Sequence, residues 1–237
     1  MTTTFTEAAA RALYTVPSSS AGRALEVVPM PDVQSVVFVV DDDVSVRESL
    51  ELLIRAAGWH AETFASPQEF LSRPRLAVPC CLVLDVTLPG LNGLELQQRL
   101  SDRTDMPIVF ITGDGTMPMC VQAMKAGAVE FLTKPLKKEA LLDAIRGAIE
   151  RSRMVLRLDE EISALKKRYE SLTPREREVM TLVVSGRLNK QVGSELGITE
   201  ITVKKHRGRM VAKMMADSLP DLVTMAARLG VGPTPKH

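Results

Sequence analysis

A short stretch near residue 40 decides the fold: Val36-Val37-Phe38-Val39-Val40-Asp41-Asp42-Asp43, in which five apolar residues run directly into three carboxylates. Such an uninterrupted apolar run is typical of a strand that is buried on both faces of a sheet. Four more runs follow, the first of them weaker: His60–Phe64, Cys81–Leu84, Ile108–Ile111 and Val129–Leu132. Amphipathic helical patterns separate these runs, so we predict an α/β fold with a doubly wound parallel sheet of five buried strands.

The helical patterns differ strongly in length. The clearest short one places apolar residues at i, i+3, i+4 and i+7 from Leu50, and Gly58 closes it as a C-cap. A much longer pattern begins after Lys134-Pro135 and meets no stop signal before Leu172. We therefore expect the last helix of the sheet domain to run on into a long helical linker.

The second half of this long pattern has apolar residues at alternating spacings of three and four: Val155, Leu158, Ile162, Leu165, Tyr169 and Leu172. Charged residues fill the positions between them, which is typical of a coiled-coil seam of about two heptads that pairs two chains. The alternative is an amphipathic helix that lies on its own domain. So short a coil is marginal alone and needs support from the flanking domains.

The remaining residues read as four short helices: Pro174 to about Val184, Asn189–Leu196, Glu200 to about Met214, and Leu219–Leu229. Glycines mark their stops, at positions 186, 197 and 230. The first helix has a strong start signal, because Thr173 is an N-cap followed by Pro174 and, three residues after the cap, by Glu176.

These patterns divide the 237 residues into five segments. We predict a disordered extension (1–34), a sheet domain (35–150), a helical coiled-coil linker (151–171), an all-α four-helix domain (172–232) and a tail (233–237). The composition is 45% hydrophobic and 25% charged, as in globular proteins. No apolar run is long enough to span a membrane and the N-terminus lacks a signal-peptide pattern, so we expect a cytoplasmic protein without a membrane partner.

The net charge of +1 hides an asymmetry along the chain. Residues 171–237 carry 11 Lys and Arg against 6 Asp and Glu, whereas residues 1–170 carry 19 against 23. A basic C-terminal domain favours a polyanionic partner.

Acidic, hydroxyl and amino side chains follow the predicted strands at their carboxyl ends: Asp41, Asp42 and Asp43, then Asp85, Thr112 and Lys134. Parallel strands bring these ends to one edge of the sheet, so we expect one pocket. Carboxylates held close together repel one another, and Mg²⁺ on oxygen ligands is the usual compensation. Beside the metal, the hydroxyl and the ammonium, Asp85 would accept a phosphoryl group as an aspartyl phosphate. Asp43 is interpreted instead as a helix N-cap.

The basic domain has a helix-turn-helix pattern, with two short helices joined by Gly197-Ile198-Thr199. The second helix begins with Thr199 and Thr202, which can contact the DNA backbone, and Val203 and Met210 should face the core. Its cations can contact guanine edges and phosphates in the major groove: Lys204, Lys205, Arg207 and Arg209. A solvated cationic face is the alternative for a charge run of this kind.

Four segments carry a family resemblance: Val39-Val40-Asp41-Asp42-Asp43, Leu84-Asp85-Val86-Thr87-Leu88-Pro89-Gly90, Ile111-Thr112-Gly113 and Phe131-Leu132-Thr133-Lys134-Pro135. Through them, residues 35–150 resemble the flavodoxin-like receiver domain of two-component response regulators. The resemblance implies that Asp85 accepts phosphate from a histidine kinase. It further implies that Asp42, Asp85 and the main-chain carbonyl of Thr87 bind Mg²⁺ directly and that Asp41 does so through water.

The same resemblance assigns the remaining residues of the pocket. Lys134 would contact the phosphoryl group, Thr112 would follow it, and Phe131 would rotate inward behind it. We expect the moving face to comprise the helix at about residues 116–126, the fifth strand and the start of the long helix, because these follow Thr112 and Phe131 directly. As a further hypothesis, Asp114 would orient the water that hydrolyses the phosphate.

The C-terminal residues 170–232 resemble the LuxR-type helix-turn-helix in these segments: Leu172-Thr173-Pro174-Arg175-Glu176-Arg177-Glu178-Val179, Asn189-Lys190-Gln191-Val192, Leu196-Gly197-Ile198-Thr199 and Thr202-Val203-Lys204-Lys205-His206-Arg207. With the receiver domain in front, the whole chain is similar to response regulators of the FixJ type. In this family Glu176 is structural and does not contact DNA. Gly193 stands where the family commonly has alanine, which costs helix stability but lets helices approach closely.

We therefore predict a response regulator whose phosphorylation on Asp85 controls dimerisation and sequence-specific binding to promoter DNA. The expected partners are a sensor histidine kinase, double-stranded DNA, a second copy of the chain and RNA polymerase. Asp85 would hydrolyse its phosphate slowly, but the chain is not a dedicated enzyme: phosphatases of this chemistry need a second acid two residues after the nucleophile, where this chain has Thr87. A nucleic-acid module that works without phosphate, or on RNA, is the remaining alternative.

Overall fold

The structure is a computed structural model that describes residues 35–113 and 115–232. The predicted extension (1–34), Asp114 and the predicted tail (233–237) lie outside these residues.

The first part of the described chain folds around a parallel sheet in the strand order β2-β1-β3-β4-β5. The strands are β1 (Val36–Val40), β2 (His60–Phe64), β3 (Cys80–Asp85), β4 (Ile108–Thr112) and β5 (Glu130–Thr133). Each strand bound lies within one residue of its prediction, and the α/β fold is confirmed. The prediction that all five strands are buried is wrong. β2 and β5 form the two edges of the sheet, and most of their residues are half-buried or exposed.

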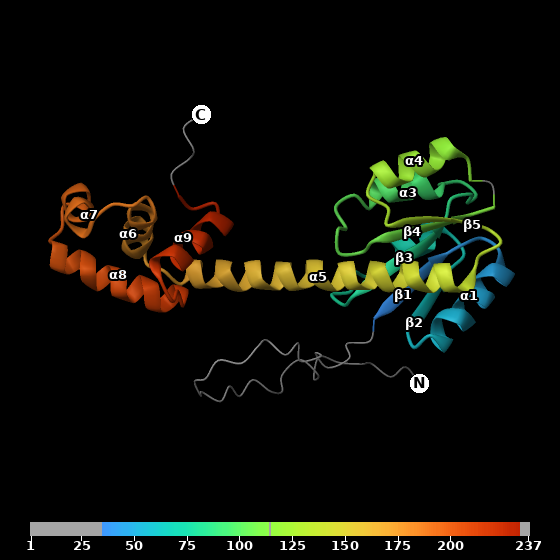
Figure 1. Cartoon of the computed structure of the whole chain (residues 1–237), viewed down its shortest axis with the longest axis horizontal. Coiled ribbons are helices and arrows are strands. Elements are labelled where there is room, and N and C mark those ends of the chain that lie inside the picture. The colour runs from blue at the N-terminus through green and yellow to red at the C-terminus, as the bar shows by residue number, and fades with distance from the viewer. Residues whose placement is uncertain (1–34, 114, 233–237) are drawn as a thin grey trace. The chain divides into compact units, whose positions relative to one another are not determined.

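Helices cover both faces of this sheet (Figure 1). One face packs against α1 (Val44–Ala56) and the first half of α5 (Lys138–Glu170). The other packs against α2 (Pro67–Leu71), α3 (Gly93–Arg99) and α4 (Met117–Lys125). Each strand contributes side chains to both faces, because successive side chains point in opposite directions. Phe38 packs on the face that α2, α3 and α4 cover, and Val39 packs on the face that α1 and α5 cover.

α1 begins and ends where its sequence signals place it. Asp43 is the N-cap and its carboxylate accepts the N–H of Ser45 at 2.8 Å. Ala57 is the C-cap, and Gly58 follows with a φ of 93°, a left-handed conformation that glycine adopts without strain. The predicted N-cap role of Asp43 is thereby confirmed.

A polar contact holds α5 on the sheet. Ser152 is fully buried and is the last buried residue of α5 before Leu165. Its hydroxyl accepts the N–H of Cys80 at 3.0 Å and donates to the carbonyl of Asp105. Asp105 is itself buried, and Arg75 binds its carboxylate at 2.6 Å. The hydroxyl thus joins α5 to the first residue of β3 and to the segment before β4.

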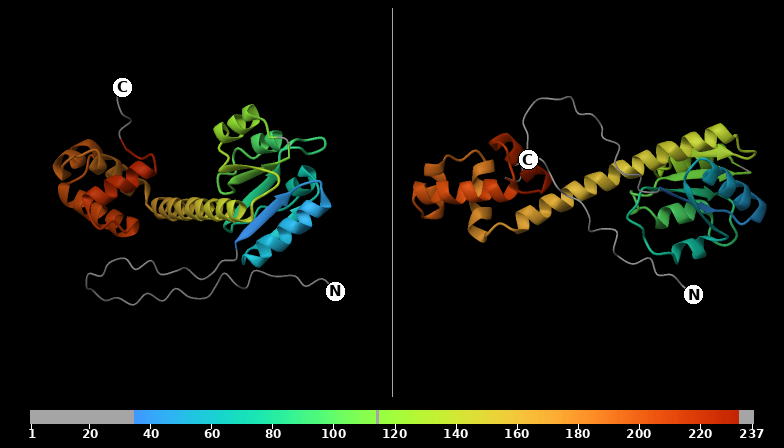
Figure 2. Two further views of the ribbon diagram at one scale, coloured as in Figure 1. Left: turned by 45° about the vertical axis from the view of Figure 1, so that its right-hand side comes forward. Right: turned by 90° about the horizontal axis from the view of Figure 1, so that it is seen from below.

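α5 continues as one uninterrupted helix to Glu170 (Figure 2), so the predicted boundary between residues 150 and 151 lies inside a helix. Four helices follow: α6 (Pro174–Val184), α7 (Asn189–Leu196), α8 (Glu200–Met214) and α9 (Leu219–Arg228). Their bounds agree with the predicted ones to within one residue. They share a core with the end of α5, to which Val179, Met180, Val203 and Met210 contribute fully buried side chains.

None of the helices within residues 35–113 and 115–232 has both the length and the apolar content that crossing a bilayer requires.

Candidate functional site

The carboxyl edge of the sheet carries the predicted acidic pocket. β1 and β3 are neighbours, and Val40 pairs with Leu84, so that Asp41 and Asp85 follow at the same level. Both side chains are buried, whereas Asp42 is exposed. The N–H groups of Asp43 and Thr87 each donate to the aspartate two residues earlier, Asp41 and Asp85, at 2.9 Å. Main-chain hydrogen bonds therefore fix the orientation of both buried carboxylates.

Lys134 bridges these two carboxylates. Its Nζ donates to Oδ2 of Asp41 at 2.7 Å and to Oδ2 of Asp85 at 2.6 Å. Burial alone would lower the pKa of the Lys134 ammonium, but its hydrogen bonds to Asp41 and Asp85 outweigh burial and hold that pKa above its ordinary value. Burial raises the pKa of Asp41, and the lysine only partly offsets this rise. The pocket thus holds more negative charge than one ammonium satisfies.

The acidic residues fit a divalent cation. Asp41, Asp42 and Asp85 each place one carboxylate oxygen within 4.8 Å of the other two. Carboxylate oxygens are the hard donors that Mg²⁺ prefers, and a ligand set built from one exposed and two buried carboxylates leaves solvent access on one side. Thr87, the source of the predicted carbonyl ligand, is exposed beside them.

Thr112 and Phe131 lie next to this pocket on β4 and β5. Thr112 is fully buried, and its carbonyl accepts the N–H of Lys134 at 2.7 Å. Phe131 pairs with Phe110 across the strands and is half-buried. Gly115 fits closely between the two predicted residues, since a Cβ there would lie 2.8 Å from Cγ2 of Thr112 and 2.9 Å from Cε1 of Phe131.

Arg47 is a residue of this site that sequence reasoning missed. Its Nη1 donates to the carbonyls of Asp41 at 2.7 Å and Asp42 at 2.9 Å. The guanidinium thus ties the first turn of α1 back to the acidic loop. The available signal was its place: Asp43 caps the helix, so an arginine four residues later lies on the turn nearest the loop.

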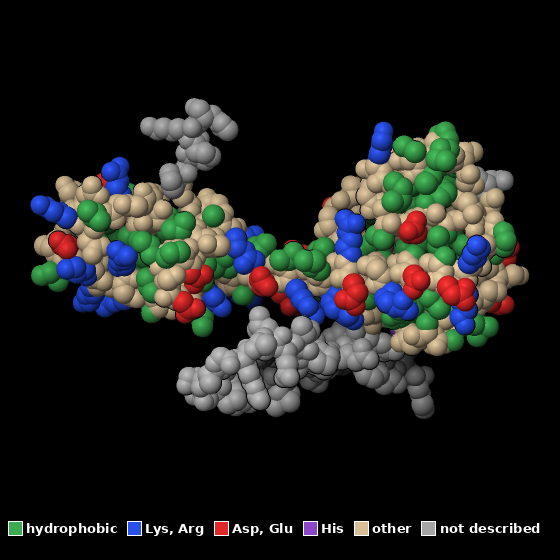
Figure 3. Space-filling view, viewed as in Figure 1, with side chains coloured by type: hydrophobic (Ala, Val, Ile, Leu, Met, Phe, Trp, Pro, Cys, Tyr) green, Lys and Arg blue, Asp and Glu red, His purple; other side chains and the backbone are tan. Residues whose placement is uncertain are grey.

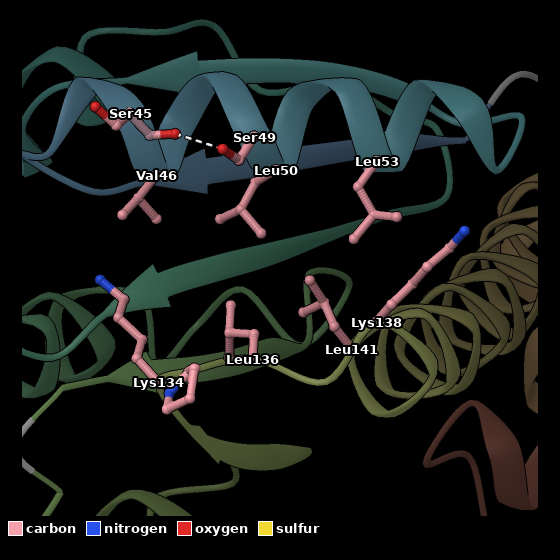
Figure 4. Close-up of a pocket in the computed structure, with 10 residues that line it drawn as sticks. Ser45, Val46, Ser49, Leu50, Leu53, Lys134, Leu136, Lys138 and Leu141 are labelled. Atoms are coloured by element: carbon pink, nitrogen blue, oxygen red, sulfur yellow. Dashed lines mark hydrogen bonds between the residues drawn. The ribbon is translucent and has the colours of Figure 1, made fainter.

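A pocket of about 400 Å³ adjoins Lys134 between α1 and the segment that joins β5 to α5 (Figure 4). Val46, Leu50 and Leu53 point from α1 toward Leu136 and Leu141 on the other side. The apolar lining belongs to the core that α1 and α5 form with the sheet, and Lys134 lines this pocket and also contacts the acidic cluster.

The second candidate site is the pair α7 and α8. Gly197 ends α7 in the left-handed conformation with a φ of 66°, and Thr199 caps α8 by accepting the N–H of Thr202 at 3.2 Å. Val203 and Met210 are fully buried, as predicted. Lys and Arg side chains gather on the surface of the domain that α6 to α9 form (Figure 3).

The predicted DNA-contacting residues divide into two groups. Lys204, Lys205 and Arg209 are exposed. Arg207 is half-buried, and its Nη1 donates to Oδ1 of Asn189 at 3.0 Å. Arg207 therefore joins α8 to α7, so it has a structural role in the packing of these two helices.

Gly193 and Glu176 also serve the packing of these helices, as predicted. A Cβ on Gly193 would lie 2.7 Å from the carbonyl oxygen of Ile198, so this glycine lets α7 approach the turn closely. Glu176 is buried, caps α6 together with Thr173, and binds Lys213 at 2.6 Å.

The predicted seam on α5 has two different surroundings. Leu165 and Tyr169 pack into the core of α6 to α9, and the guanidinium of Arg177 lies 5.2 Å from the centre of the Tyr169 ring. For these two residues the alternative interpretation, a helix packed on its own domain, is the one observed. Val155 and Ile162 are half-buried and Leu158 is 44% exposed.

Two known domain families match the chain. The family "Response regulator receiver domain" matches residues 37–146, and the family "Bacterial regulatory proteins, luxR family" matches residues 170–226. The protein named transcriptional regulatory protein FixJ from Azorhizobium caulinodans is 40% identical over 198 residues, which cover 83% of this chain and 94% of FixJ. The chain belongs to the FixJ-type response regulators.

Two further proteins are similar to this response regulator over most of its length. Nodulation protein W from Bradyrhizobium diazoefficiens is 48% identical over 199 residues, which cover 84% of this chain and 88% of that protein. The solved structure of the response regulator StyR is 45% identical, covers 82% of this chain and 99% of StyR, and superimposes with a TM-score of 0.74. The predicted family and its two-domain composition are confirmed.

Proposed function

We propose that this response regulator accepts a phosphoryl group on Asp85 and that the modification controls its dimerisation and its binding to promoter DNA. The observation that carries the proposal is the position of Lys134, which donates to the carboxylates of both Asp41 and Asp85. An ammonium at this place can transfer its hydrogen bonds to phosphoryl oxygens while it stays beside the carboxylate that binds phosphorus.

Asp41, Asp42 and Asp85 would hold Mg²⁺, with the Thr87 carbonyl as a further ligand. When bound, this ion supplies positive charge against the carboxylates and the incoming phosphoryl oxygens. The chain's own residues prepare the site: Arg47 fixes the acidic loop through two carbonyls, and the Thr87 N–H orients Asp85.

Thr112 and Phe131 are the proposed switch. Phosphorylation adds negative charge and acceptor oxygens, toward which the Thr112 hydroxyl would turn. Because Gly115 separates Thr112 from Phe131 without a side chain of its own, a shift of the threonine opens or closes space for the ring. α4 begins two residues after Gly115, so the movement would reach that helix.

For the output we propose that α8 enters the major groove of duplex DNA. Lys204, Lys205 and Arg209 are exposed and would contact bases and phosphates, while Thr199 and Thr202 lie at the helix start near the backbone. Two copies would bind a two-fold site, which adds their binding energies.

Dimerisation of the linker would use the part of the seam that α6 to α9 do not cover. Val155, Leu158 and Ile162 lie between Ser152 and Leu165, the nearest buried residues of α5 on either side. The proposed division is then a receiver domain (35–150), a linker (151–171) and a DNA-binding domain (172–232), flanked by the segments 1–34 and 233–237.

The proposed partners follow from these two domains: a sensor histidine kinase, promoter DNA and, at the promoter, RNA polymerase. Such a regulator works in the cytoplasm, where bacterial DNA lies. The aspartyl phosphate would hydrolyse slowly at the receiver site and so end the signal, which is not the turnover of a dedicated enzyme.

Sedimentation velocity tests the proposal on the full chain with Mg²⁺, with and without beryllofluoride, which stands in for the phosphoryl group. We expect wild type to change from monomer to dimer with beryllofluoride and Asp85→Asn to remain monomeric. A dimer of both proteins in all conditions would show that phosphorylation does not control association. An unchanged wild-type monomer would contradict the proposal at the acceptor site itself.

A further inference from the structure

Ile201 is an apolar side chain in an unexpected place. It lies in the first turn of α8 and is 79% exposed, the highest value for any large apolar side chain among the described residues. The helix start is well formed there, because Thr199 accepts the N–H of Thr202 and the two hydroxyls lie 2.9 Å apart. Ile201 is therefore held outward by an ordered turn.

The face that carries Ile201 is otherwise lined by lysines, one of which, Lys204, also forms an exposed ion pair with Glu200 at 3.2 Å. Lys204, Lys205 and Gly208 follow it at i+3, i+4 and i+7 and so share its side of the helix, and both lysines are exposed. A Cβ on Gly208 would meet nothing within 4 Å, so this face is open at its centre. Val203, on the opposite side, is fully buried in the domain core.

The surrounding charge decides what this isoleucine contacts. A second copy of the same face would bring lysines against lysines, whereas duplex DNA offers phosphates to the lysines and an apolar group to the isoleucine. That group is the C5-methyl of thymine, which is exposed in the major groove and is read there by apolar side chains. The N-terminal residues of a recognition helix are the ones that reach base edges.

We propose that Ile201 is a specificity-determining residue that reads a thymine methyl group in each half-site of the DNA. The inference rests on the proposed function, because it requires that α8 enter the major groove. It adds to that function a named base and a named group on that base.

The experiment begins with the full chain, activated with Mg²⁺ and beryllofluoride, which selects its preferred sequences from a random duplex library. In the enriched duplex the thymines are then replaced by uracil one at a time, and each replacement removes one C5-methyl group and nothing else. Dissociation constants are measured for wild type, Ile201→Ala and Leu188→Ala. Leu188 is the matched control, because it is 70% exposed and lies before α7, outside the recognition helix.

We expect one thymine per half-site at which uracil weakens wild-type binding about fourfold, the value of one buried methyl group. Ile201→Ala should bind thymine DNA as weakly as wild type binds uracil DNA, and uracil should weaken it no further. Leu188→Ala should keep the uracil effect. Lys204→Ala should lose affinity for both duplexes equally.

Three results would overturn the inference. The first is that uracil weakens the binding of wild type and of Ile201→Ala by the same factor. The second is that uracil weakens the binding of neither protein. The third is that Leu188→Ala also loses the uracil effect. Failure of the proposed function looks different, since wild type would then enrich no duplex. Thermal unfolding confirms that Ile201→Ala is folded, as expected for a substitution at an exposed position.

Discussion

The Nζ of Lys213, in the last turn of α8, lies 2.6 Å from Oε2 of the buried Glu176, in the first turn of α6. The same ammonium also donates to the carbonyl of Ser171 at 3.2 Å. One lysine thus joins the end of the recognition helix to the start of the DNA-binding domain.

Glu176→Gln should destabilise this domain by about 1 to 3 kcal/mol, because it weakens the charged hydrogen bond that the half-buried Lys213 makes to a buried carboxylate. Hydrogen exchange of the α6 amides measures the effect locally. Glu178→Gln is the control: Glu178 also forms an ion pair, with Arg175, but its side chain is 51% exposed, so the loss of its charge should cost less than about 1 kcal/mol. Equal losses in the two variants would contradict the assignment.

The same pair gives the domain a dependence on pH. Burial would raise the pKa of Glu176, but the hydrogen bonds from Lys213 and from the Thr173 N–H outweigh it and hold the pKa below the ordinary 4.5. Its contribution is therefore complete above pH 4.5 and is lost as the pH falls through the lower folded-state value. Protection of the α6 amides in wild type should decline in that range, and it should decline less in Glu176→Gln.

Asp41→Asn should weaken Mg²⁺ binding at least about tenfold, since it removes one of three converging carboxylates. Isothermal titration calorimetry measures the affinity. Asp43→Asn is two residues away and should leave it unchanged, because Asp43 caps α1 and asparagine caps a helix equally well. A similar loss in both variants would mean that charge alone, and not ligation, attracts the ion.

Gly115→Ala should oppose the proposed switch. The added Cβ would lie under 3 Å from both Thr112 and Phe131. Thr112 could then not turn, and Phe131 could not rotate behind it, without strain of about 1 to 3 kcal/mol. We expect about tenfold more beryllofluoride to be needed for dimerisation, measured by sedimentation velocity. Gly113→Ala, where a Cβ meets nothing within 4 Å, should behave like wild type.

Two further glycines should respond in opposite directions to alanine. Gly193→Ala places a Cβ 2.7 Å from the Ile198 carbonyl, and the resulting strain should outweigh the gain in helix propensity, with a net loss of about 1 kcal/mol. Gly208→Ala has open space and should stabilise α8 by up to about 1 kcal/mol. Thermal unfolding of the two variants should show midpoints on opposite sides of that of wild type.

The sequence predicted the sheet and the acidic pocket for a physical reason. Apolar runs mark strands, and a parallel sheet brings the residues after them to one edge, so Asp41 and Asp85 had to lie near each other. The bridging position of Lys134 was beyond this reasoning, because it depends on side-chain rotamers across three strands. Arg47 was missed because its partners are main-chain carbonyls, so that its place four residues after the Asp43 N-cap was the one signal that pointed to it.

The seam on α5 shows a different limit of prediction from the sequence. Spacings of three and four state which side chains share a face of a helix, and they do not state what covers that face. Leu165 and Tyr169 meet the domain core of their own chain, whereas Leu158 on the same stripe stays exposed. The charge run that contains Arg207 is ambiguous in the same way, because it does not state what each cation contacts. A cation in a recognition helix can bind DNA or, as Arg207 does, a neighbouring asparagine.

Ser152 constrains how α5 can transmit a movement. Its hydroxyl is bonded on two sides, to Cys80 and to Asp105, so a piston stroke of a single residue, about 1.5 Å along the axis, would break both bonds. A tilt of the helix beyond the serine would keep them, and it would leave Leu141, Ile145 and Ile149 in the core of the sheet domain. Glu170 lies about 27 Å farther along the helix, where a tilt of about 10° becomes a displacement of about 5 Å. Ser152 therefore marks the end of the part of α5 that the sheet holds in place, and we expect any movement beyond it to be a change in helix direction and not a shift along the helix axis.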